Sequence, residues 1–500
     1  MPNVRSDFEP APERRVFCNR TLNMRSIRAV GFDMDYTLVH YDVRAWEERA
    51  YAHVQLQLLE RGLPVGDLRF DPDLFTRGLI VDLALGNIVK ANRFGYITQA
   101  AHGTQILAHE TQRHAYSQVW VDLGEPRWVF LNTLFSLSEA CLYGQLVDLL
   151  DSGGLDGGRL ERDALGPAGS NGLDYKSLYT LVSAAMDAAH LEGQLKAEII
   201  AAPERFVDLD PLLAQTLLDL KQAGKRLFLA TNSEWHYTSA MMGYLFDSHF
   251  GAERAGAMRG WRGLFDLVIV QAKKPSFFDQ TAPFAEVVDD AGTLRPLQGP
   301  LRKGAVYKGG NAQAVQEHFH VDGSEILYVG DHVYADVHVS SQIRRWRTAL
   351  VLRELEDEVL QEQQFAAGQA ELEVHMHHKE RLDQEQAMLR LALQRLEHGG
   401  PLPAGVPGTA PSIQERLRAL RAEIDALDQR IVPLAKQSGH LGHVRWGPSM
   451  RAGNDKSRLA RQIEGHADVY TSRVSNLQAL SPFGYLRASR GSLPHDAARG

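Results

Sequence analysis

Two aspartates one residue apart, Asp33 and Asp35, are the residues of this chain best placed to do chemistry. They directly follow the apolar run 28–32, which has the length and composition of a buried strand. In an open α/β sheet, chemistry gathers outside the carboxyl ends of the strands. A carboxylate pair at such an end suits a nucleophile and a neighbouring acid or base around a hard cation. Each aspartate taken alone could equally be a helix N-cap.

Three further polar groups follow later apolar runs in the same way. They are Thr231-Asn232-Ser233 after 226–230, Lys274 after 267–271, and Asp331 with Asp336 after 326–329. Taken alone, Thr231 and Asp331 could be turn residues, and Lys274 could be a solvated surface lysine. Asp336 could be a helix cap or a supporting carboxylate. Their order, strand-end placement and chemical complementarity favour a single site.

This combination of side chains indicates phosphoryl transfer. Hard oxygen ligands without a Cys or His cluster suit Mg²⁺. Phosphoryl transfer needs charge neutralisation and positioning above all. A hydroxyl and a lysine can hold phosphate oxygens while one carboxylate attacks phosphorus as a covalent nucleophile. We therefore predict a Mg²⁺-dependent site at this edge of the sheet.

The order of these motifs resembles the haloacid dehalogenase superfamily of phosphohydrolases. More narrowly, Gly31–Leu38 resembles the first motif of the cytosolic purine (IMP/GMP-type) 5′-nucleotidases. Other segments similar to that family are 75–79, 131–135, 230–233, 274–278, 306–310, 446–451 and 485–487. The resemblance spans most of residues 16–353 and about 444–496.

The resemblance implies a role for each motif residue. Asp33 would be the nucleophile that forms a phosphoaspartate, and Asp35 would be the general acid and then the general base. The residues implied to hold Mg²⁺ are Asp33, the backbone carbonyl of Asp35, and Asp331, with Asp336 as a further acidic residue. The residues implied to bind the phosphate are Thr231, Asn232 and Lys274.

By the same resemblance, a second set of residues contacts the nucleoside. The set is Asn132, Phe135, Asp187, His190 and Lys196. Phe135 would stack on the base, although alone it could be an ordinary core aromatic. The chain departs from the family here, with Ser183 where the family has a purine-contacting arginine and Leu191 where it has a tyrosine. Losing the guanidinium weakens the expectation of 6-oxopurine selectivity.

The strand candidates, completed by the run 348–352, favour a doubly wound parallel α/β sheet of the haloacid dehalogenase type. A large helical cap insertion would interrupt it. We predict a catalytic core (16–42 and 205–353), a cap or substrate-recognition insertion (43–204), a helical hairpin (354–438) and a C-terminal segment that packs on the core (439–500). The Gly-rich stretch 152–172 is expected to be a surface loop.

Apolar spacing predicts the hairpin. Residues 354–397 are rich in Glu, Gln, Leu and Arg, and a Gly- and Pro-rich linker spans 399–411. Ser412 and Glu415 then form a capping-box pattern. Apolar residues follow in unbroken 4-3 spacing at Ile413, Leu417, Leu420, Ile424, Leu427, Ile431 and Leu434. A coiled-coil-like antiparallel pair is the simplest arrangement, and a long amphipathic helix packed on the body is the alternative.

Two other clusters invite functional interpretation. The first is His375, His377 and His378, which could suggest a metal site but lie in a polar helix and are expected to be solvated. The second is Arg344 and Arg345 with Arg347 nearby, which could form an effector or phosphate pocket or serve as helix caps.

Composition bounds the class of protein. The 500 residues carry a net charge of −8, which argues against a nucleic-acid binder. Two cysteines are too few for a disulfide framework or a zinc site. No apolar stretch reaches membrane-spanning length and the polar start is no signal peptide, so we expect a soluble cytoplasmic protein without a membrane partner.

The expected function is Mg²⁺-dependent hydrolysis of nucleoside 5′-monophosphates, and the resemblance implies purine bases. A phosphoaspartate can in principle be captured by a nucleoside, which would give phosphotransferase activity. Related enzymes form homo-oligomers, so we expect one here. The alternatives are a phosphatase for another phosphomonoester, suggested by Ser183 and Leu191, and a scaffold or regulatory protein assembled through the helices of 354–434.

Overall fold

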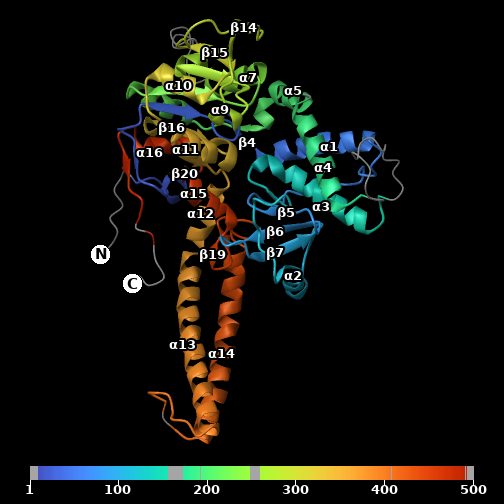
Figure 1. Ribbon diagram of the computed structural model, residues 1–500, viewed down its shortest axis with the longest axis vertical. Helices are drawn as coiled ribbons and strands as arrows, with labels where there is room; N and C mark the ends of the chain where they lie inside the picture. Colours follow the sequence, from blue (N-terminus) through green and yellow to red (C-terminus); the bar gives the residue numbers. More distant parts are fainter. Residues whose placement is uncertain are drawn as a thin grey trace. The chain divides into compact units, whose positions relative to one another are not determined.

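The computed structural model describes residues 9–155, 173–191, 193–247, 260–406, 408–489 and 491, without the side chains of His190 and Leu191. The chain divides into two compact units (Figure 1). The first comprises Met1–Glu356 and Ser449–Gly500, and the second comprises Asp357–Pro448. The predicted loop 152–172 lies, from residue 156 onward, outside the described residues.

A ten-stranded sheet is the centre of the first unit, in the order β1-β20-β17-β16-β3-β11-β12-β15-β13-β14. The strands are β1 Phe17–Cys18, β3 Ala29–Phe32, β11 Arg226–Ala230, β12 Leu267–Val270, β13 Phe284–Val287, β14 Leu294–Pro296, β15 Ala305–Gly309, β16 Ile326–Gly330, β17 Arg347–Val351 and β20 Val469–Thr471. The strands from β20 to β15 are parallel, and β1, β13 and β14 are antiparallel edges. The five predicted strands and the mixed α/β class are confirmed.

The sheet reverses its strand order at β3, which lies between β11 and β16. All four residues of β3 are buried, as expected for a strand covered on both faces. Gly31 is needed here, because a Cβ atom at that position would lie 2.2 Å from the Phe228 ring. A switch point of this kind opens a crevice at the carboxyl ends of the neighbouring strands.

Helices surround the sheet in the first unit (Figure 1). They are α6 Leu213–Gln222, α7 Trp235–Phe246, α9 Ser276–Asp279, α10 Ala312–Phe319, α11 Val339–Arg344, α15 Arg458–His466 and α16 Leu477–Leu480. Aromatic residues from sheet and helices pack in one buried cluster, in which Phe278 and Trp346 meet Tyr328 of β16. Short strand pairs β4 (His40–Tyr41) with β10 (Val207–Asp208) and β2 (Leu22–Asn23) with β21 (Tyr485–Leu486) connect distant parts of the chain.

The prediction that residues 43–204 are a helical insertion is wrong in one respect, because the segment also contains a five-stranded antiparallel sheet, β8-β7-β6-β5-β9. Its strands are β5 Ile80–Asp82, β6 Asn87–Ala91, β7 Ile97–His102, β8 Gln105–Ile106 and β9 Trp128–Phe130. Its helices are α1 Val43–Glu60, α2 His109–Tyr116, α3 Leu137–Asp151, α4 Tyr175–Leu191 and α5 Gln194–Ala201. Gly86, Gly95 and Gly103 supply the positive φ of the hairpin turns, and these strands of two to six residues carry little apolar periodicity.

The C-terminal residues complete the main sheet. Strand β20 lies between β17 and β1, so a strand from each end of the chain extends the same edge. The Asp468 carboxylate, just before β20, accepts hydrogen bonds from Arg20 Nε at 2.6 Å and Arg347 Nε at 2.9 Å. The short hairpin β18 (Arg451–Ala452) with β19 (Asp455–Lys456) precedes α15.

The second unit consists mainly of two long helices, α13 Ala366–Glu397 and α14 Ala410–Gly439, preceded by α12 Leu355–Gln364, which begins in the first unit. The helices pack on each other through a seam of buried residues. The seam is Leu372, Leu382, Leu389, Ala392, Ile413, Leu420, Leu427 and Ile431. The predicted Ser412–Glu415 capping box is wrong, because the helix begins earlier and Thr409 and Ser412 form the box. Pro411 can stand in the first turn because its missing N–H would have no partner within the helix there.

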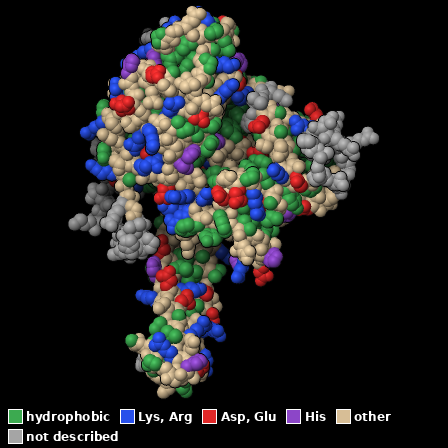
Figure 2. All heavy atoms as spheres, in the orientation of Figure 1, with side chains coloured by type: hydrophobic (Ala, Val, Ile, Leu, Met, Phe, Trp, Pro, Cys, Tyr) green, Lys and Arg blue, Asp and Glu red, His purple; other side chains and the backbone are tan. Residues whose placement is uncertain are grey.

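Among the described helices, none is long and apolar enough to cross a membrane. Figure 2 shows Lys and Arg side chains interspersed with Asp and Glu over the visible face of the molecule.

Candidate active site

Four charged side chains from three strand ends of the main sheet meet in one buried cluster. Lys274 Nζ lies 2.6 Å from Asp33 Oδ1 and 2.6 Å from Asp336 Oδ1. One carboxylate oxygen from each of Asp33, Asp331 and Asp336 lies within 4.8 Å of the other two. All four residues are at most 8 % exposed. The structure therefore brings the first, third and fourth predicted motifs together.

The cluster holds three carboxylates against one ammonium group. Burial raises the pKa of Asp33 to about 7; the charges of Asp336 and Asp35 add to this effect, and Lys274 opposes it. The pKa of Asp331 is also raised, by burial and by the two neighbouring aspartates. Burial disfavours the Lys274 ammonium, but the two carboxylates it contacts outweigh burial and raise its pKa. The carboxyl groups therefore outnumber the ammonium group, and the cluster has too little positive charge to balance them.

A divalent cation fits this deficit. Asp331 Oδ2 is buried without a hydrogen-bond partner in the described part of the chain, and such an atom is costly unless something else binds it. Hard carboxylate oxygens are the ligands that Mg²⁺ prefers. Among the described residues, Asp33, Asp331 and Asp336 are also the one group of three acidic, His or Cys side chains close enough to share an ion.

Local backbone structure places Asp336 in the cluster. A Cβ atom on Gly330 would lie 2.5 Å from the Asp336 side chain, so only glycine leaves room for it at the end of β16. The other carboxylate oxygen, Asp336 Oδ2, accepts a hydrogen bond from the His332 backbone N–H at 3.2 Å. Asp336 is therefore fixed at both oxygens, by Lys274 and by the turn after β16.

The second motif is tied to the third by reciprocal hydrogen bonds. Asn232 Nδ2 donates to the Lys274 carbonyl at 3.1 Å, and the Lys274 backbone N–H donates to Asn232 Oδ1 at 2.7 Å. Thr231 is fully buried, and its Oγ1 accepts from the Ser233 backbone N–H at 3.0 Å. Thr231, Asn232 and Lys274 are therefore held in one rigid constellation.

Asp35 is held by two residues to which the sequence analysis assigned no role. Tyr41 Oη donates to Asp35 Oδ1 at 2.6 Å, and Ser233 Oγ donates to Asp35 Oδ2 at 2.7 Å. Lys196 reaches the same region from α5, with Nζ 3.5 Å from Ser233 Oγ and 3.1 Å from Glu234 Oε2. The structure thus brings Lys196 beside the second motif.

The predicted nucleoside-contacting residues have different surroundings. Phe135 packs edge-on against Tyr36, the neighbour of Asp35, with ring centroids 4.6 Å apart. The Asn132 carbonyl accepts from Arg77 Nε at 2.9 Å. Asp187 is exposed on α4, and no contact joins it to the aspartate cluster in the described residues. The side chains of His190 and Leu191 lie outside the described residues.

Ser183 takes part in a buried polar contact. Burial raises the pKa of Glu139, and hydrogen bonds from Ser183 and Tyr179 oppose that shift. The position where the resemblance led us to expect a purine-contacting arginine is therefore occupied by Ser183, which interacts with the buried Glu139 carboxyl group on α3.

Arg77 connects several parts of the site and was missed as a functional residue. Its guanidinium is buried, with the whole residue 2 % exposed. It donates to the backbone carbonyls of Asn132 and Asp331 and pairs with Glu354, with Nη1 3.3 Å from Oε1. The segment 75–79 was noticed for its family resemblance, but a contact across 254 residues leaves no local pattern.

We expect Arg77→Met to destabilise the first unit by about 3–5 kcal/mol, because it leaves buried acceptors and a carboxylate without their partner. Urea unfolding measures the difference. The control is Arg69→Met, which removes an exposed guanidinium bonded to the Gly66 and Leu68 carbonyls and should cost less than about 0.5 kcal/mol. Equal losses for the two variants would contradict a positioning role for Arg77.

Glu47 on α1 is fully buried, and it lies close enough to Tyr36 to interact with it electrostatically. Its Oε2 accepts from the Ser138 backbone N–H at 2.8 Å, and its Oε1 has no partner among the described residues. Burial raises the pKa of Glu47 to about 8, with hydrogen bonds from Ser138 opposing and the charge of Glu139 adding. Glu47 is therefore protonated in the folded protein at pH 7.

This pKa predicts a pH dependence of stability. Between pH 4.5 and 8 the folded state holds a proton at Glu47 that the unfolded state releases, so the free energy of unfolding falls as pH rises. Glu47→Gln should remove this contribution, and the wild type should lose roughly 4 kcal/mol relative to the variant from pH 4.5 to pH 8. Urea unfolding at both ends of the range tests this, with exposed Glu48→Gln as control. Parallel pH profiles for wild type and Glu47→Gln would contradict it.

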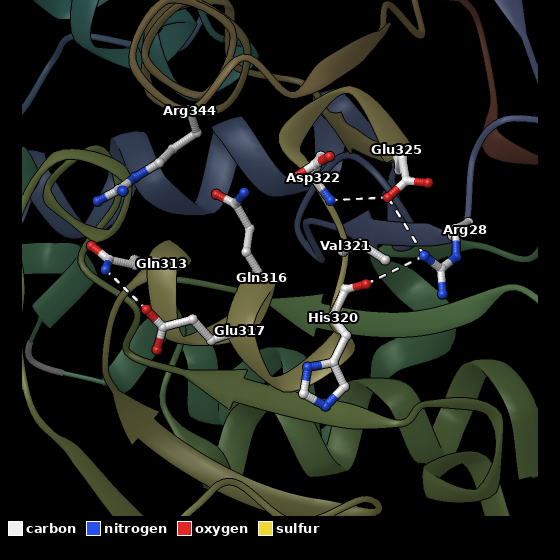
Figure 3. A pocket seen from close by; sticks show the side chains of 9 residues that line it. All are labelled: Arg28, Gln313, Gln316, Glu317, His320, Val321, Asp322, Glu325 and Arg344. Carbon is white, nitrogen blue, oxygen red and sulfur yellow. Dashed lines mark hydrogen bonds and ion pairs between the residues drawn. The ribbon is translucent and has the colours of Figure 1, made fainter.

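A separate polar pocket of about 660 Å³ lies at the opposite, amino end of the strands. Figure 3 shows Arg28 in it, just before β3, linked to Glu325 and to the His320 carbonyl. None of the clustered aspartates lines it. Arg344 does line it, while Arg344 Nε donates to the Phe278 carbonyl. The pocket is lined by three carboxylates and two guanidinium groups and contains none of the candidate catalytic groups, so we do not assign the reaction to it.

The two remaining predicted clusters, the arginines near 345 and the histidines near 377, make contacts typical of structural residues. Arg345 is the C-cap of α11 with φ 58°, and Arg347 pairs with Asp468. His377 Nδ1 contacts the Glu373 carbonyl at 2.8 Å, and His375 pairs with Glu371. His378 is exposed. No group of potential metal ligands includes these histidines in the described part of the chain.

Comparison with known proteins gives one consistent result. The model of the 5′ nucleotidase family matches residues 16–498, nearly the whole chain. A 5′-nucleotidase domain-containing protein of Dictyostelium discoideum is 26 % identical over 493 residues, which cover 96 % of this chain and 74 % of that protein. The chain therefore belongs to the 5′-nucleotidase family and is a phosphoric monoester hydrolase.

Proposed function

We propose that the protein is a Mg²⁺-dependent 5′-nucleotidase that hydrolyses nucleoside 5′-monophosphates through a phosphoaspartate on Asp33. The observation that carries the proposal is the buried cluster of Asp33, Lys274, Asp331 and Asp336. The strand order β17-β16-β3-β11-β12 supports a haloacid dehalogenase-like core, with residues 43–204 as the cap that receives the nucleoside.

Asp33, Asp331 and the backbone carbonyl of Asp35 would hold Mg²⁺, with Asp336 beside them. When bound, the cation neutralises carboxylate and phosphate charge, which phosphoryl transfer requires. Among the described residues, Lys274 contributes the one positive charge within hydrogen-bonding distance of Asp33. Because Asp336 binds the same ammonium group, Lys274 stays in position when Asp33 turns toward phosphorus.

In the first step, an Asp33 carboxylate oxygen attacks phosphorus, and the bond from phosphorus to the ribose 5′ oxygen breaks. Asp35 gives its proton to that oxygen, which leaves as the nucleoside hydroxyl. Thr231 and Asn232 hold the phosphate oxygens. In the second step, Asp35 takes a proton from water, the water oxygen bonds to phosphorus, and the bond from phosphorus to Asp33 breaks to release phosphate. A nucleoside in place of that water would give phosphotransferase activity.

The identity of the base is the part of the proposal for which there is an alternative. Phe135 and Lys196 are placed by the structure near the first and second motifs, which supports a nucleoside in the cap. The Ser183–Glu139 contact replaces the purine-reading arginine of the related enzymes. A carboxyl group accepts hydrogen bonds from amino groups. The Ser183–Glu139 contact therefore does not select for a 6-oxopurine, and a substrate with another base or sugar is the alternative.

Phosphate release from a substrate panel tests the proposal. The panel contains purine and pyrimidine 5′-monophosphates and sugar phosphates, each with Mg²⁺ and with excess EDTA. We expect nucleotides to be hydrolysed with the highest kcat/KM and only with Mg²⁺. A sugar phosphate that equals the best nucleotide would favour the alternative of another phosphomonoester as substrate. Activity that persists in Asp33→Asn would contradict the assigned site altogether.

A further inference from the structure

Both side-chain oxygens of Asp35 are held by hydroxyl groups of the protein. Tyr41 Oη lies 2.6 Å from Oδ1, and Ser233 Oγ lies 2.7 Å from Oδ2. Both hydroxyls donate, and the two carboxyl oxygens of Asp35 accept. The Asp35 carboxyl group therefore cannot rotate about its Cβ–Cγ bond without breaking two hydrogen bonds.

A second tyrosine extends the arrangement. Tyr237 Oη lies 2.8 Å from Tyr41 Oη. Because Tyr41 gives its one proton to Asp35, its oxygen must accept from Tyr237, and the hydrogen bonds run from Tyr237 to Tyr41 to Asp35. Tyr41 belongs to β4 and Tyr237 to α7. Two elements from separate parts of the chain thus converge on one carboxyl group.

Packing alone does not account for these hydroxyls. Tyr41 is 2 % exposed and Tyr237 is 0 % exposed. The Tyr41 ring lies 4.4 Å from Trp46 and 5.2 Å from Tyr36, centroid to centroid. Phenylalanine would fill the same apolar surroundings without burying a polar group, which is costly unless it is hydrogen-bonded. What a tyrosine adds at position 41 is its bond to Asp35.

We propose that Tyr41, Ser233 and Tyr237 are positioning residues for Asp35, holding its carboxyl group so that the oxygen position that carries the transferred proton faces the leaving oxygen of the substrate. The inference rests on the proposed function, in which Asp35 protonates the ribose 5′ oxygen. An alkoxide leaving group needs that proton, whereas p-nitrophenolate leaves without it. A misplaced Asp35 should therefore harm the two kinds of substrate unequally.

The test compares kcat/KM for a nucleoside 5′-monophosphate and for p-nitrophenyl phosphate, both with Mg²⁺. This ratio covers only the steps up to leaving-group departure, so the later role of Asp35 toward water does not enter. Tyr41→Phe should lower it about 10-fold to 100-fold for the nucleotide and less than about threefold for the aryl phosphate. Ser233→Ala should act in the same direction, and Tyr237→Phe more weakly.

Two controls separate positioning from damage to the fold. Tyr143→Phe removes a buried hydroxyl without a hydrogen-bond partner among the described residues and should leave both values unchanged. In an Asp35→Asn background, Tyr41→Phe should change the nucleotide value by less than about twofold, since its effect passes through Asp35.

Equal losses on both substrates in Tyr41→Phe would overturn the inference, as would no loss on either. Additive effects of Tyr41→Phe and Asp35→Asn would also overturn it. A wild type that cleaves p-nitrophenyl phosphate but no nucleotide contradicts the proposed substrate, and the positioning role then has to appear with another alkyl phosphate. A wild type that cleaves neither contradicts the proposed function, and the inference fails with it.

Discussion

Asp33→Asn is expected to lower phosphate release from nucleoside monophosphates by about 10⁴-fold or more. The amide keeps the shape of the side chain but cannot attack phosphorus. Lys274 retains its contact with Asp336, so the site should stay assembled and still bind nucleotide. Steady-state phosphate release measures the loss, and isothermal titration with a nucleotide measures binding.

The control for Asp33→Asn is Asp67→Asn, which changes an exposed carboxylate far from Asp33 in the sequence. No hydrogen bond joins Asp67 to the cluster in the described residues. This control variant should leave kcat and KM unchanged. If Asp33→Asn retained more than about one per cent of wild-type activity, another residue would have to be the nucleophile.

Removal of Mg²⁺ is the second change with a large expected effect. Excess EDTA should lower activity at least about 10³-fold, and added Mg²⁺ should restore it. Binding should also be visible without turnover. Because a ligand that binds only the folded state stabilises it, Mg²⁺ should raise the melting temperature of the wild type.

Asp331→Asn supplies the matching variant. It should abolish the Mg²⁺-induced rise in melting temperature, because Asp331 offers a buried carboxylate oxygen that has no hydrogen-bond partner in the described part of the chain. Without metal, the same variant should be more stable than the wild type, since it removes one of three crowded negative charges. A normal Mg²⁺ response in Asp331→Asn would show that the cation binds elsewhere.

The main sheet was predictable where strands are short, apolar and bounded by turns. The runs that became β3, β11, β12, β16 and β17 are fully or almost fully buried, and a buried parallel strand leaves a continuous apolar signature. The two strands contributed by the ends of the chain were not predictable. β1 and β20 have two and three residues and pair across about 450 positions, so tertiary contacts decide their conformation.

The insertion shows a different limit. Its β6 strand, Asn87–Ala91, is buried throughout, but it contains Asn87 and Lys90. Asn87 is satisfied by Tyr116 Oη, to which its Nδ2 donates at 2.7 Å. A buried polar residue whose partner lies far along the chain removes the apolar pattern that would have indicated a strand, and the helices on either side were easier to recognise.

The candidate site, like the fold, was predictable from the sequence only in part. Four motifs at strand ends could be placed together from the sequence, because parallel strands bring their carboxyl ends to one edge. Their supporting residues could not. Tyr41 meets Asp35 only because β4 turns back after the first motif, and Arg77 meets Asp331 only because the insertion folds against the core. Such contacts depend on the assembled fold.

The covalent role of Asp33 is the central claim, and acid quenching followed by peptide mass spectrometry tests it most directly. The enzyme with Mg²⁺ is mixed with a nucleoside 5′-monophosphate, quenched during turnover and digested, with Asp33→Asn treated in parallel. We expect one added phosphoryl group on the peptide that contains Asp33, and none in the variant. Phosphate release without any label on that peptide, or with the label on another residue, would contradict it.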